Sequence, residues 1–252
     1  MSNLINNGFE IKKNFIDKNY IIKLRSEIKN ILKQHVSIKQ RNKSIDEMYK
    51  LISKKSEKLK GNIYDVISKL TTCLSILYSK EIQGYLKKNK FKNLVHHGSS
   101  VLIMEANKKK FLFDIHQDLR NRLSKSAILI WIPISNYSKD LGGIKVWKNS
   151  NKLGILKHNI VENGTPKLKK NILSKVLKLN SYEFTNFKIG DVLFMSPYCV
   201  HSSIPNNSKL NKIRWTLVVQ VDDNTNCKHL KKSIHPFKIK KFMNIKNMYF
   251  KK

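Results

Sequence analysis

The 252-residue sequence is poor in several features, and each shortage narrows the kind of protein it can encode. Its three cysteines are odd in number, lie far apart and form no CxxC pair, so they predict neither a disulfide framework nor a cysteine-rich metal site. No stretch approaches the roughly 18 uninterrupted apolar residues that a membrane-spanning helix needs. The first residues also lack the long apolar segment of a secretory signal. We therefore expect a soluble, reduced, cytoplasmic protein.

Acidic residues are scarce relative to basic ones. The chain holds 17 Asp and Glu against 50 Lys and Arg, which gives a formal net charge of +33. A basic surface attracts nucleic acid, anionic membranes and acidic substrates, and charge alone does not choose among them. A solvated, lysine-rich surface competes with all three explanations, because the lysines are spread along the chain rather than gathered in one patch. We find no nucleic-acid recognition motif and do not expect a nucleic-acid partner.

The order of apolar patterns predicts a helical N-terminal part followed by a β-rich part. After a short strand and turn over 8–15, apolar residues recur at helical spacing across 16–34 and again across about 44–90. From about residue 93 the chain changes to short apolar or β-branched runs separated by Asn, Gly, Ser and Lys. These runs cover 101–104, 111–113, 127–134, 143–147, 191–195 and 215–221. The pattern predicts a mainly β, α+β protein in which N-terminal helices brace a β-sandwich or barrel.

We expect a single domain over residues 1–252. Its parts are a helical brace over 1–92, a β-rich core over 93–223 and a basic C-terminal tail over 224–252. A polar, lysine-rich insert at 152–181, with a helix-like stretch over 172–179, interrupts the strands of the core. Because so long an excursion between strands is often functional, the insert is predicted to be a lid or a substrate-shaping segment.

One short motif supplies candidate metal ligands. Alternate residues of a strand point to opposite faces, so the histidine and the carboxylate of His116-Gln117-Asp118 would share a face. His201, from a distant strand, completes a two-histidine, one-carboxylate set that suits non-haem Fe(II) and leaves three positions open for a co-substrate and O₂. A His-x-Asp pair alone is weak evidence, because the polar face of a surface strand shows the same spacing. Cys199 is interpreted as a small buried residue, since a thiolate favours zinc or copper.

Two neighbouring positions make the motif more specific. Trp131 lies in a strongly apolar run over 128–134, where it could wall a ligand cavity, although plain core packing is the alternative. Ser203 follows His201 by two residues, so on a strand their side chains share a face. Both positions are therefore candidates for contact with a ligand held near the metal.

Arg214 stands at the start of another apolar run. A charge that enters a buried strand is costly unless it is paired. A dicarboxylate ligand would supply the partner, because the guanidinium fork binds a carboxylate bidentately. Asp222 or Glu105 is the alternative, intramolecular partner.

Together these segments resemble the phytanoyl-CoA dioxygenase family of Fe(II)- and 2-oxoglutarate-dependent oxygenases. The resemblance covers residues 8–223 and is most diagnostic over 113–223. The matching segments are His116-Gln-Asp, Trp131 before a proline, the Gly190-Asp191 turn, His201-Ser-Ser203 and the run from Ile213-Arg-Trp-Thr-Leu to Asp222. The resemblance implies a double-stranded β-helix, the jelly-roll or cupin-like fold, for the β-rich core.

The resemblance also implies residue roles. Fe(II) would bind His116, Asp118 and His201, and the distal carboxylate of 2-oxoglutarate would bind Arg214 and Ser203 beside Trp131. The implied activity is O₂-dependent hydroxylation, desaturation or another oxidation of a small-molecule substrate.

Several alternatives stay open. Arg120, Arg122 and the lysines of the insert favour an anionic substrate if they line the mouth of the site, and are solvated surface if they do not. A basic polyanion-binding protein without turnover, or an oxygenase-like protein that binds metal but has lost activity, would share much of the pattern. The remaining histidines, His158 among them, are interpreted as surface or structural residues. Nothing fixes the oligomeric state, and a monomer is the default.

Overall fold

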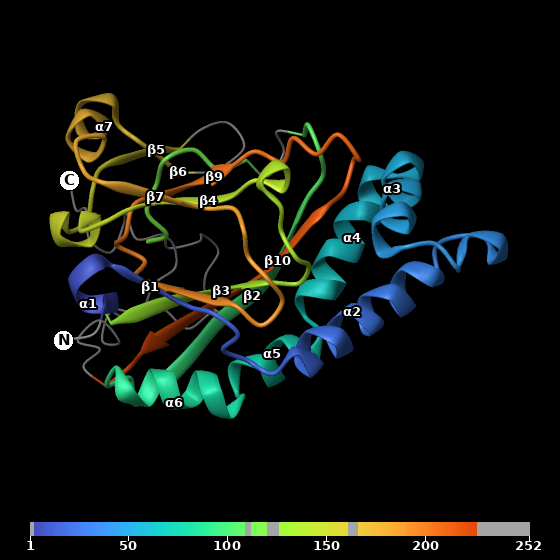
Figure 1. Ribbon diagram of the computed structural model, residues 1–252, viewed down its shortest axis with the longest axis horizontal. Coiled ribbons are helices and arrows are strands. Elements are labelled where there is room, and N and C mark those ends of the chain that lie inside the picture. Colours follow the sequence, from blue (N-terminus) through green and yellow to red (C-terminus); the bar gives the residue numbers. More distant parts are fainter. Residues whose placement is uncertain (1–2, 109–111, 120–125, 161–165, 226–252) are drawn as a thin grey trace, which may run out of the picture.

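The computed structural model describes residues 3–108, 112–119, 126–160 and 166–225 (Figure 1). Two antiparallel sheets face each other, and the N-terminal helices pack on the outer face of the larger sheet. Arg120, Arg122 and nearly all of the basic tail lie outside the described residues. Among the helices that are described, none combines the length and the apolar character needed to cross a membrane.

The N-terminal part is helical, as the spacing of its apolar residues predicts. Its helices are α1 (Asn3–Asn7), α2 (Lys18–Lys33), η1 (Ile38–Gln40), α3 (Ile45–Lys55), α4 (Glu57–Ser68), α5 (Thr71–Leu77) and α6 (Lys80–Lys88). Helix α3 begins at a capping box in which Ser44 Oγ accepts from the Glu47 backbone N–H and the Glu47 carboxylate accepts from the Ser44 N–H. In α2, Ile21, Leu24 and Ile28 recur every three or four residues and are fully buried.

The larger sheet lies between these helices and the rest of the β structure (Figure 1). Its order is β1 (Phe9–Lys12), β8 (Val192–Met195), β3 (Ala127–Pro133), β10 (Arg214–Asp223) and β2 (Leu94–Met104), and every neighbouring pair is antiparallel. Trp215, Leu217 and Val219 of β10 are fully buried in the core shared with the helices. Because side chains alternate along a strand, the intervening residues of β10 face the second sheet.

The second sheet contains β7 (Ser181–Phe184), β4 (Gly143–Trp147) and β9 (His201–Ile204) in that order. A separate core fills part of the space between the sheets, with Leu129 and Trp131 of β3 against Ile144 and Val146 of β4. The 3₁₀ helices η2 (Lys139–Leu141) and η3 (Ser150–Leu153) flank β4. Two facing sheets braced by N-terminal helices confirm the mainly β, α+β architecture that the sequence predicts.

The insert packs onto the second sheet. It contains the hairpin β5 (His158–Ile160) and β6 (Pro166–Leu168) and the helix α7 (Lys170–Val176), which starts and ends earlier than the predicted 172–179. Leu168 and Val176 are buried against Trp147 and Val200 in a small apolar cluster of their own. The described part of the insert is therefore docked on the sheet that carries His201.

One predicted strand is wrong. The apolar run that precedes His116 was expected to be a strand carrying the metal ligands, but residues 112–115 have no regular structure and His116 forms only an isolated bridge with His201. Apolar composition favours a strand only where a neighbouring chain can complete its hydrogen bonds. Before the bridge the pairing is irregular, because Ser203 N–H donates to the carbonyl of Phe113 while Phe113 N–H donates to Ser203 Oγ rather than to a backbone carbonyl. After the bridge it stops, because Asp118 N–H donates to the carbonyl of Pro197.

A pair of glycine substitutions tests the close approach of β4 to β7. A Cβ added at Gly143 would collide with the carbonyl oxygen of Phe184, whereas a Cβ at Gly61 in α4 would meet nothing within 4 Å. We expect Gly143→Ala to lower the free energy of unfolding by about 1–3 kcal/mol, and Gly61→Ala to raise it by up to about 1 kcal/mol. Urea denaturation of the two variants measures both. Equal stability of the two variants would contradict the tight packing at Gly143.

Candidate functional site

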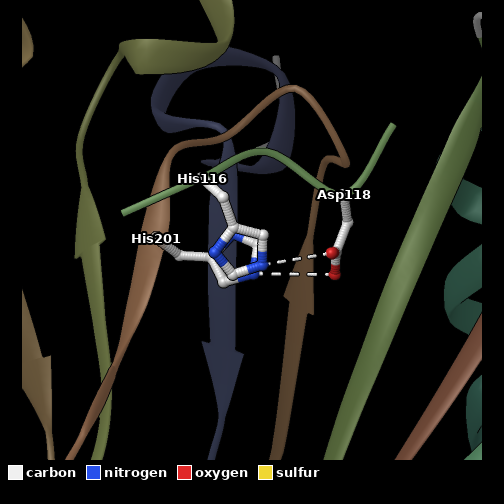
Figure 2. A group of neighbouring side chains, drawn as sticks. All are labelled: His116, Asp118 and His201. Atoms are coloured by element: carbon white, nitrogen blue, oxygen red, sulfur yellow. Dashed lines mark ion pairs between the residues drawn. The ribbon is translucent and has the colours of Figure 1, made fainter. Parts of the chain in front are cut away.

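Three side chains from two segments that are far apart in the sequence converge between the sheets. His116 Nε2 lies 3.3 Å from Asp118 Oδ1, and His201 Nε2 lies 3.6 Å from Asp118 Oδ2 (Figure 2). The three ligand atoms all lie within 4.8 Å of one another. The two histidines are buried, while the Asp118 side chain keeps 29% of its surface exposed. The structure thus brings together the three predicted metal ligands.

The backbone fixes how the two imidazoles point. His116 and His201 exchange a pair of backbone hydrogen bonds of 2.9 and 3.0 Å, which places their rings side by side with centroids 4.3 Å apart. His116 Nδ1 lies 2.6 Å from the carbonyl of Asp114, and His201 Nδ1 lies 3.1 Å from that of Cys199. A carbonyl only accepts, so each Nδ1 carries the proton and each Nε2 is left as the basic atom that faces Asp118.

The electrostatics of the cluster follow from its burial and its one negative charge. Burial by itself lowers the pKa of His116, but the hydrogen bond and charge of Asp118 outweigh it and leave that pKa raised. Burial raises the pKa of Asp118, but the two imidazoles outweigh it and hold that pKa well below its usual value. The carboxylate is therefore ionised at neutral pH, as a metal ligand must be.

The geometry and the chemistry of the donors both fit a divalent metal. Ligand atoms about 2.1 Å from an ion and at right angles to one another lie about 3 Å apart, close to the 3.3 and 3.6 Å separations seen here. Two imidazole nitrogens and one carboxylate oxygen are the set found in non-haem iron oxygenases. The three residues also line an adjacent cavity.

That cavity has a volume of about 310 Å³ and lies between the two sheets. The cluster lines one wall, together with Ser203 on β9. The inward residues of the larger sheet line the other, among them Trp131 on β3 and Arg214 on β10. The volume is at the lower end of the range for small-molecule sites. All the predicted site residues therefore reach one cavity.

Arg214 is a buried cation without an acidic partner among the described residues. It is only 4% exposed, and its Nη1 donates to the carbonyls of Leu141 and Ile204 at 2.9 and 2.7 Å. Both alternative partners are excluded: Glu105 pairs with Lys60, and Asp222 lies eight residues along β10, about 26 Å away.

The groups around Arg214 leave its positive charge available to bind an anion. Burial lowers the pKa of its guanidinium, which remains cationic because an arginine does not lose its proton in proteins. Its Nη2 lies 2.9 Å from the sulfur of Met104, a weak acceptor. Backbone carbonyls and a thioether do not neutralise a buried charge, so a carboxylate that enters the cavity would supply the missing counter-charge.

Ser203 and Trp131 occupy different walls. Ser203 Oγ accepts from the backbone N–H of Phe113 at 3.2 Å, which leaves its hydroxyl hydrogen available on the cavity side. The Trp131 ring packs edge-on against Tyr137 and Phe187, with centroids 5.9 and 5.1 Å away. Trp131 therefore has both predicted roles, since it is a core residue and also lines the cavity.

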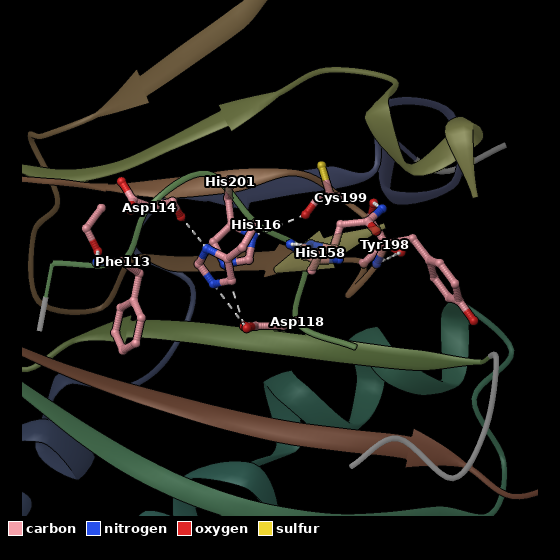
Figure 3. A network of polar contacts seen from close by, with 11 residues as sticks. Phe113, Asp114, His116, Asp118, His158, Tyr198, Cys199 and His201 are labelled. Atoms are coloured by element: carbon pink, nitrogen blue, oxygen red, sulfur yellow. Dashed lines mark hydrogen bonds and ion pairs between the residues drawn. The ribbon is translucent and has the colours of Figure 1, made fainter. Parts of the chain in front are cut away.

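Sequence reasoning missed the residues that hold the ligand loop. Gln117 is 1% exposed; its Nε2 donates to the carbonyls of Gly154 and Tyr198 at 2.8 and 2.6 Å, and its Oε1 accepts from Leu156 N–H at 2.9 Å. Its own N–H donates to His158 Nε2 at 3.0 Å. Figure 3 shows His158 beside the cluster of His116, Asp118 and His201. The only feature of the sequence that could have pointed to Gln117 was its position between His116 and Asp118.

No signal in the sequence pointed to His158, which comes from the insert. Its Nδ1 lies 2.8 Å from the carbonyl of Leu156, so Nε2 is the acceptor for Gln117. Burial lowers the pKa of His158, which keeps the ring neutral and able to accept. The described base of the insert is thus hydrogen-bonded to the segment that carries His116 and Asp118.

No protein-family model matches the chain, and a search of curated proteins finds no relative. Solved structures do match its shape. SnoK, a non-heme alpha-ketoglutarate-dependent carbocyclase from nogalamycin biosynthesis, superposes with a TM-score of 0.59 at 15% identity over 92% of this chain and 88% of its own. EctD from S. alaskensis, solved with bound Fe, superposes with a TM-score of 0.58 at 12% identity, over 89% of this chain and 75% of its own. HygX from Streptomyces hygroscopicus, solved with nickel and 2-oxoglutarate, superposes with a TM-score of 0.53 at 9% identity, over 88% of this chain and 84% of its own.

These similarities establish the fold. The chain has the jelly-roll fold of non-heme oxygenases, with its two facing sheets and helical brace. The expected double-stranded β-helix is therefore confirmed. At such low identities the similarity does not transfer an activity.

A substitution at Gln117 tests whether this side chain positions the ligands. Gln117→Leu removes three hydrogen bonds from the loop between His116 and Asp118. Loss of hydrogen bonds that hold metal ligands in place weakens metal binding, and we expect a loss on the order of 10-fold in Co(II) affinity. Isothermal titration of the metal-free protein measures the affinity, and the melting temperature shows whether the fold persists. Gln34→Leu, at an exposed position that ends α2, is the matched control. A folded Gln117→Leu variant with unchanged affinity would contradict this role.

Proposed function

We propose that the protein is an Fe(II)- and 2-oxoglutarate-dependent oxygenase that oxidises a small molecule. One observation carries the proposal: a buried cation without an acidic partner among the described residues, Arg214, shares a cavity with the His116, Asp118 and His201 cluster. The cluster accounts for a metal, and Arg214 accounts for an anionic co-substrate bound next to it. The Fe bound in EctD, the 2-oxoglutarate bound in HygX and the alpha-ketoglutarate dependence of SnoK support this metal and co-substrate.

Each residue has a distinct task in this proposal. His116, Asp118 and His201 hold the metal from one side, and Arg214 with the Ser203 hydroxyl holds the distal carboxylate of 2-oxoglutarate. When bound, Fe(II) and 2-oxoglutarate supply the oxidative chemistry, in which O₂ converts the keto acid to succinate and CO₂ and oxidises the substrate. The protein contributes ligand geometry, orientation and apolar walls that exclude water.

The finer assignment to the phytanoyl-CoA dioxygenase family rests on the sequence segments around the site. Asp118 occupies the carboxylate position, Trp131 lines the cavity beside Val218, and Arg214 begins the last strand. These features support a phytanoyl-CoA dioxygenase-like enzyme as the proposed subfamily.

Removal of the carboxylate ligand tests the metal assignment. In Asp118→Ala the two imidazoles remain but the only charged ligand is lost, so we expect Fe(II)-dependent succinate release from 2-oxoglutarate to fall to background. Asp114→Ala is the control, because the Asp114 side chain is half exposed and pairs with Lys167 on the surface. Mass-spectrometric detection of succinate measures both variants. Wild-type-like release by Asp118→Ala would overturn the assignment.

Replacement of the buried arginine tests the co-substrate assignment. Arg214→Lys keeps the charge but loses the bidentate fork, so we expect the Kd of 2-oxoglutarate under anaerobic conditions to rise about 10- to 100-fold. Arg25→Lys is the matched control, because Arg25 also donates to a backbone carbonyl, that of Ile134, but lies outside the cavity. Anaerobic titration with Fe(II) present reports the Kd. Equal affinity in the two variants would show that Arg214 does not bind the co-substrate.

A further inference from the structure

The cavity extends well beyond the position that the co-substrate would occupy. Arg214, Thr216, Val218 and Gln220 of β10 all line it. At about 3.3 Å per residue, Gln220 lies about 20 Å along the strand from Arg214. A five-carbon diacid held at Arg214 and at the metal cannot span that distance. The end of the cavity at Gln220 is therefore available to the substrate.

Uncharged polar groups mark this end of the cavity. Gln220 and Ser100 line it from β10 and β2, and Tyr64 of α4 lines it from beside the edge strand β2. Burial raises the pKa of Tyr64, and its hydroxyl hydrogen-bonds with Ser100 and Ser68, so it is a neutral hydrogen-bonding group near pH 7. These three side chains, Tyr64, Ser100 and Gln220, are called the Gln220 subsite below.

The Gln220 subsite has unused hydrogen-bonding capacity and open space. The carboxamide of Gln220 is partly buried and has no hydrogen-bond partner in the described part of the chain. Its neighbour across the β10–β2 ladder is Gly98, where an added Cβ would meet nothing within 4 Å. A ligand group that hydrogen-bonds the Gln220 carboxamide in place of water would gain affinity.

The cavity lining has far fewer basic residues than the rest of the protein. The chain has 50 Lys and Arg, yet among the described residues that line the cavity Arg214 is the only one of these, and no lysine is present. Leu102, Leu129 and Val218 make the walls beside the Gln220 subsite apolar. An anionic group placed there would be desolvated without a described cation to pair with, which is unfavourable.

We propose that the Gln220 subsite binds an uncharged hydrogen-bonding group of the substrate, a hydroxyl or an amide, carried on a mainly apolar skeleton. The proposal rests on the proposed function and adds the chemical class of the substrate. Gln220 can donate and accept, as hydroxyls and amides require, and Ser100 supplies a second donor and acceptor.

A panel of matched compounds tests the substrate class. It contains alcohols and primary amides of six to ten carbons, each paired with the carboxylic acid and the phosphate monoester of the same skeleton. We expect the uncharged members to stimulate succinate release above the basal rate of the wild-type protein, and their charged partners to give at least 10-fold less stimulation. Stronger stimulation by the charged partners, or none by any uncharged member, would overturn the proposal.

Variants of the Gln220 subsite test its location. Gln220→Leu should lower kcat/KM for a stimulating alcohol or amide about 10-fold, the loss expected for one buried hydrogen bond, while the anaerobic Kd of 2-oxoglutarate stays unchanged. Gln220→Lys should raise kcat/KM for the carboxylic acid relative to the alcohol or amide of the same skeleton. The control Gln34→Leu should leave kcat/KM and the Kd of 2-oxoglutarate unchanged. Wild-type kcat/KM in folded Gln220→Leu would overturn the assignment of the site.

Different results would contradict the proposed function and the Gln220 subsite. If the wild-type protein binds no 2-oxoglutarate and releases no basal succinate, the proposed function fails and the substrate class fails with it. If both are observed but the panel or the Gln220 variants give the contrary results, only the Gln220 subsite is wrong.

Discussion

The alternation of side chains along β10 is the constraint on which the rest of the structure depends. Trp215, Leu217 and Val219 point to the helices and build the larger core, while Arg214 and Gln220 point to the opposite face and mark the two ends of the cavity. One strand therefore ties the helical brace to the site. A shift of register by one residue would put Arg214 into the helix interface and the apolar side chains into the cavity.

A second constraint assembles the cluster of His116, Asp118 and His201. The His116–His201 bridge consists of two backbone hydrogen bonds, and the carbonyls behind each imidazole turn both Nε2 atoms toward Asp118. The sequence analysis expected a strand to carry His116 and Asp118 on one face. The same convergence is achieved in an irregular segment, which Gln117 holds through hydrogen bonds to the insert and to the loop before β9. The local pattern named the three residues that the structure brings together, but not the support that positions them.

Charge acts differently on the surface and in the cavity. Most of the basic side chains are solvent-exposed lysines, whose charge water screens at little cost. Arg214 is a buried cation beside a cavity, where an unmatched charge is costly and a ligand carboxylate would compensate it. The position of one charge therefore says more about the proposed function than the net charge of +33 does.

The sequence by itself determined the helical brace, most of the strands and the residues of the His116, Asp118, His201 and Arg214 set, because periodicity and the chemistry of ligand side chains are local properties. Only the tertiary structure decided that Arg214 has neither Glu105 nor Asp222 as its partner, that His158 supports the ligand loop, and that Gln220 shares the cavity. Each of these facts depends on distances between segments that are far apart in the chain. Such distances follow from how the two sheets pack, which no local pattern encodes.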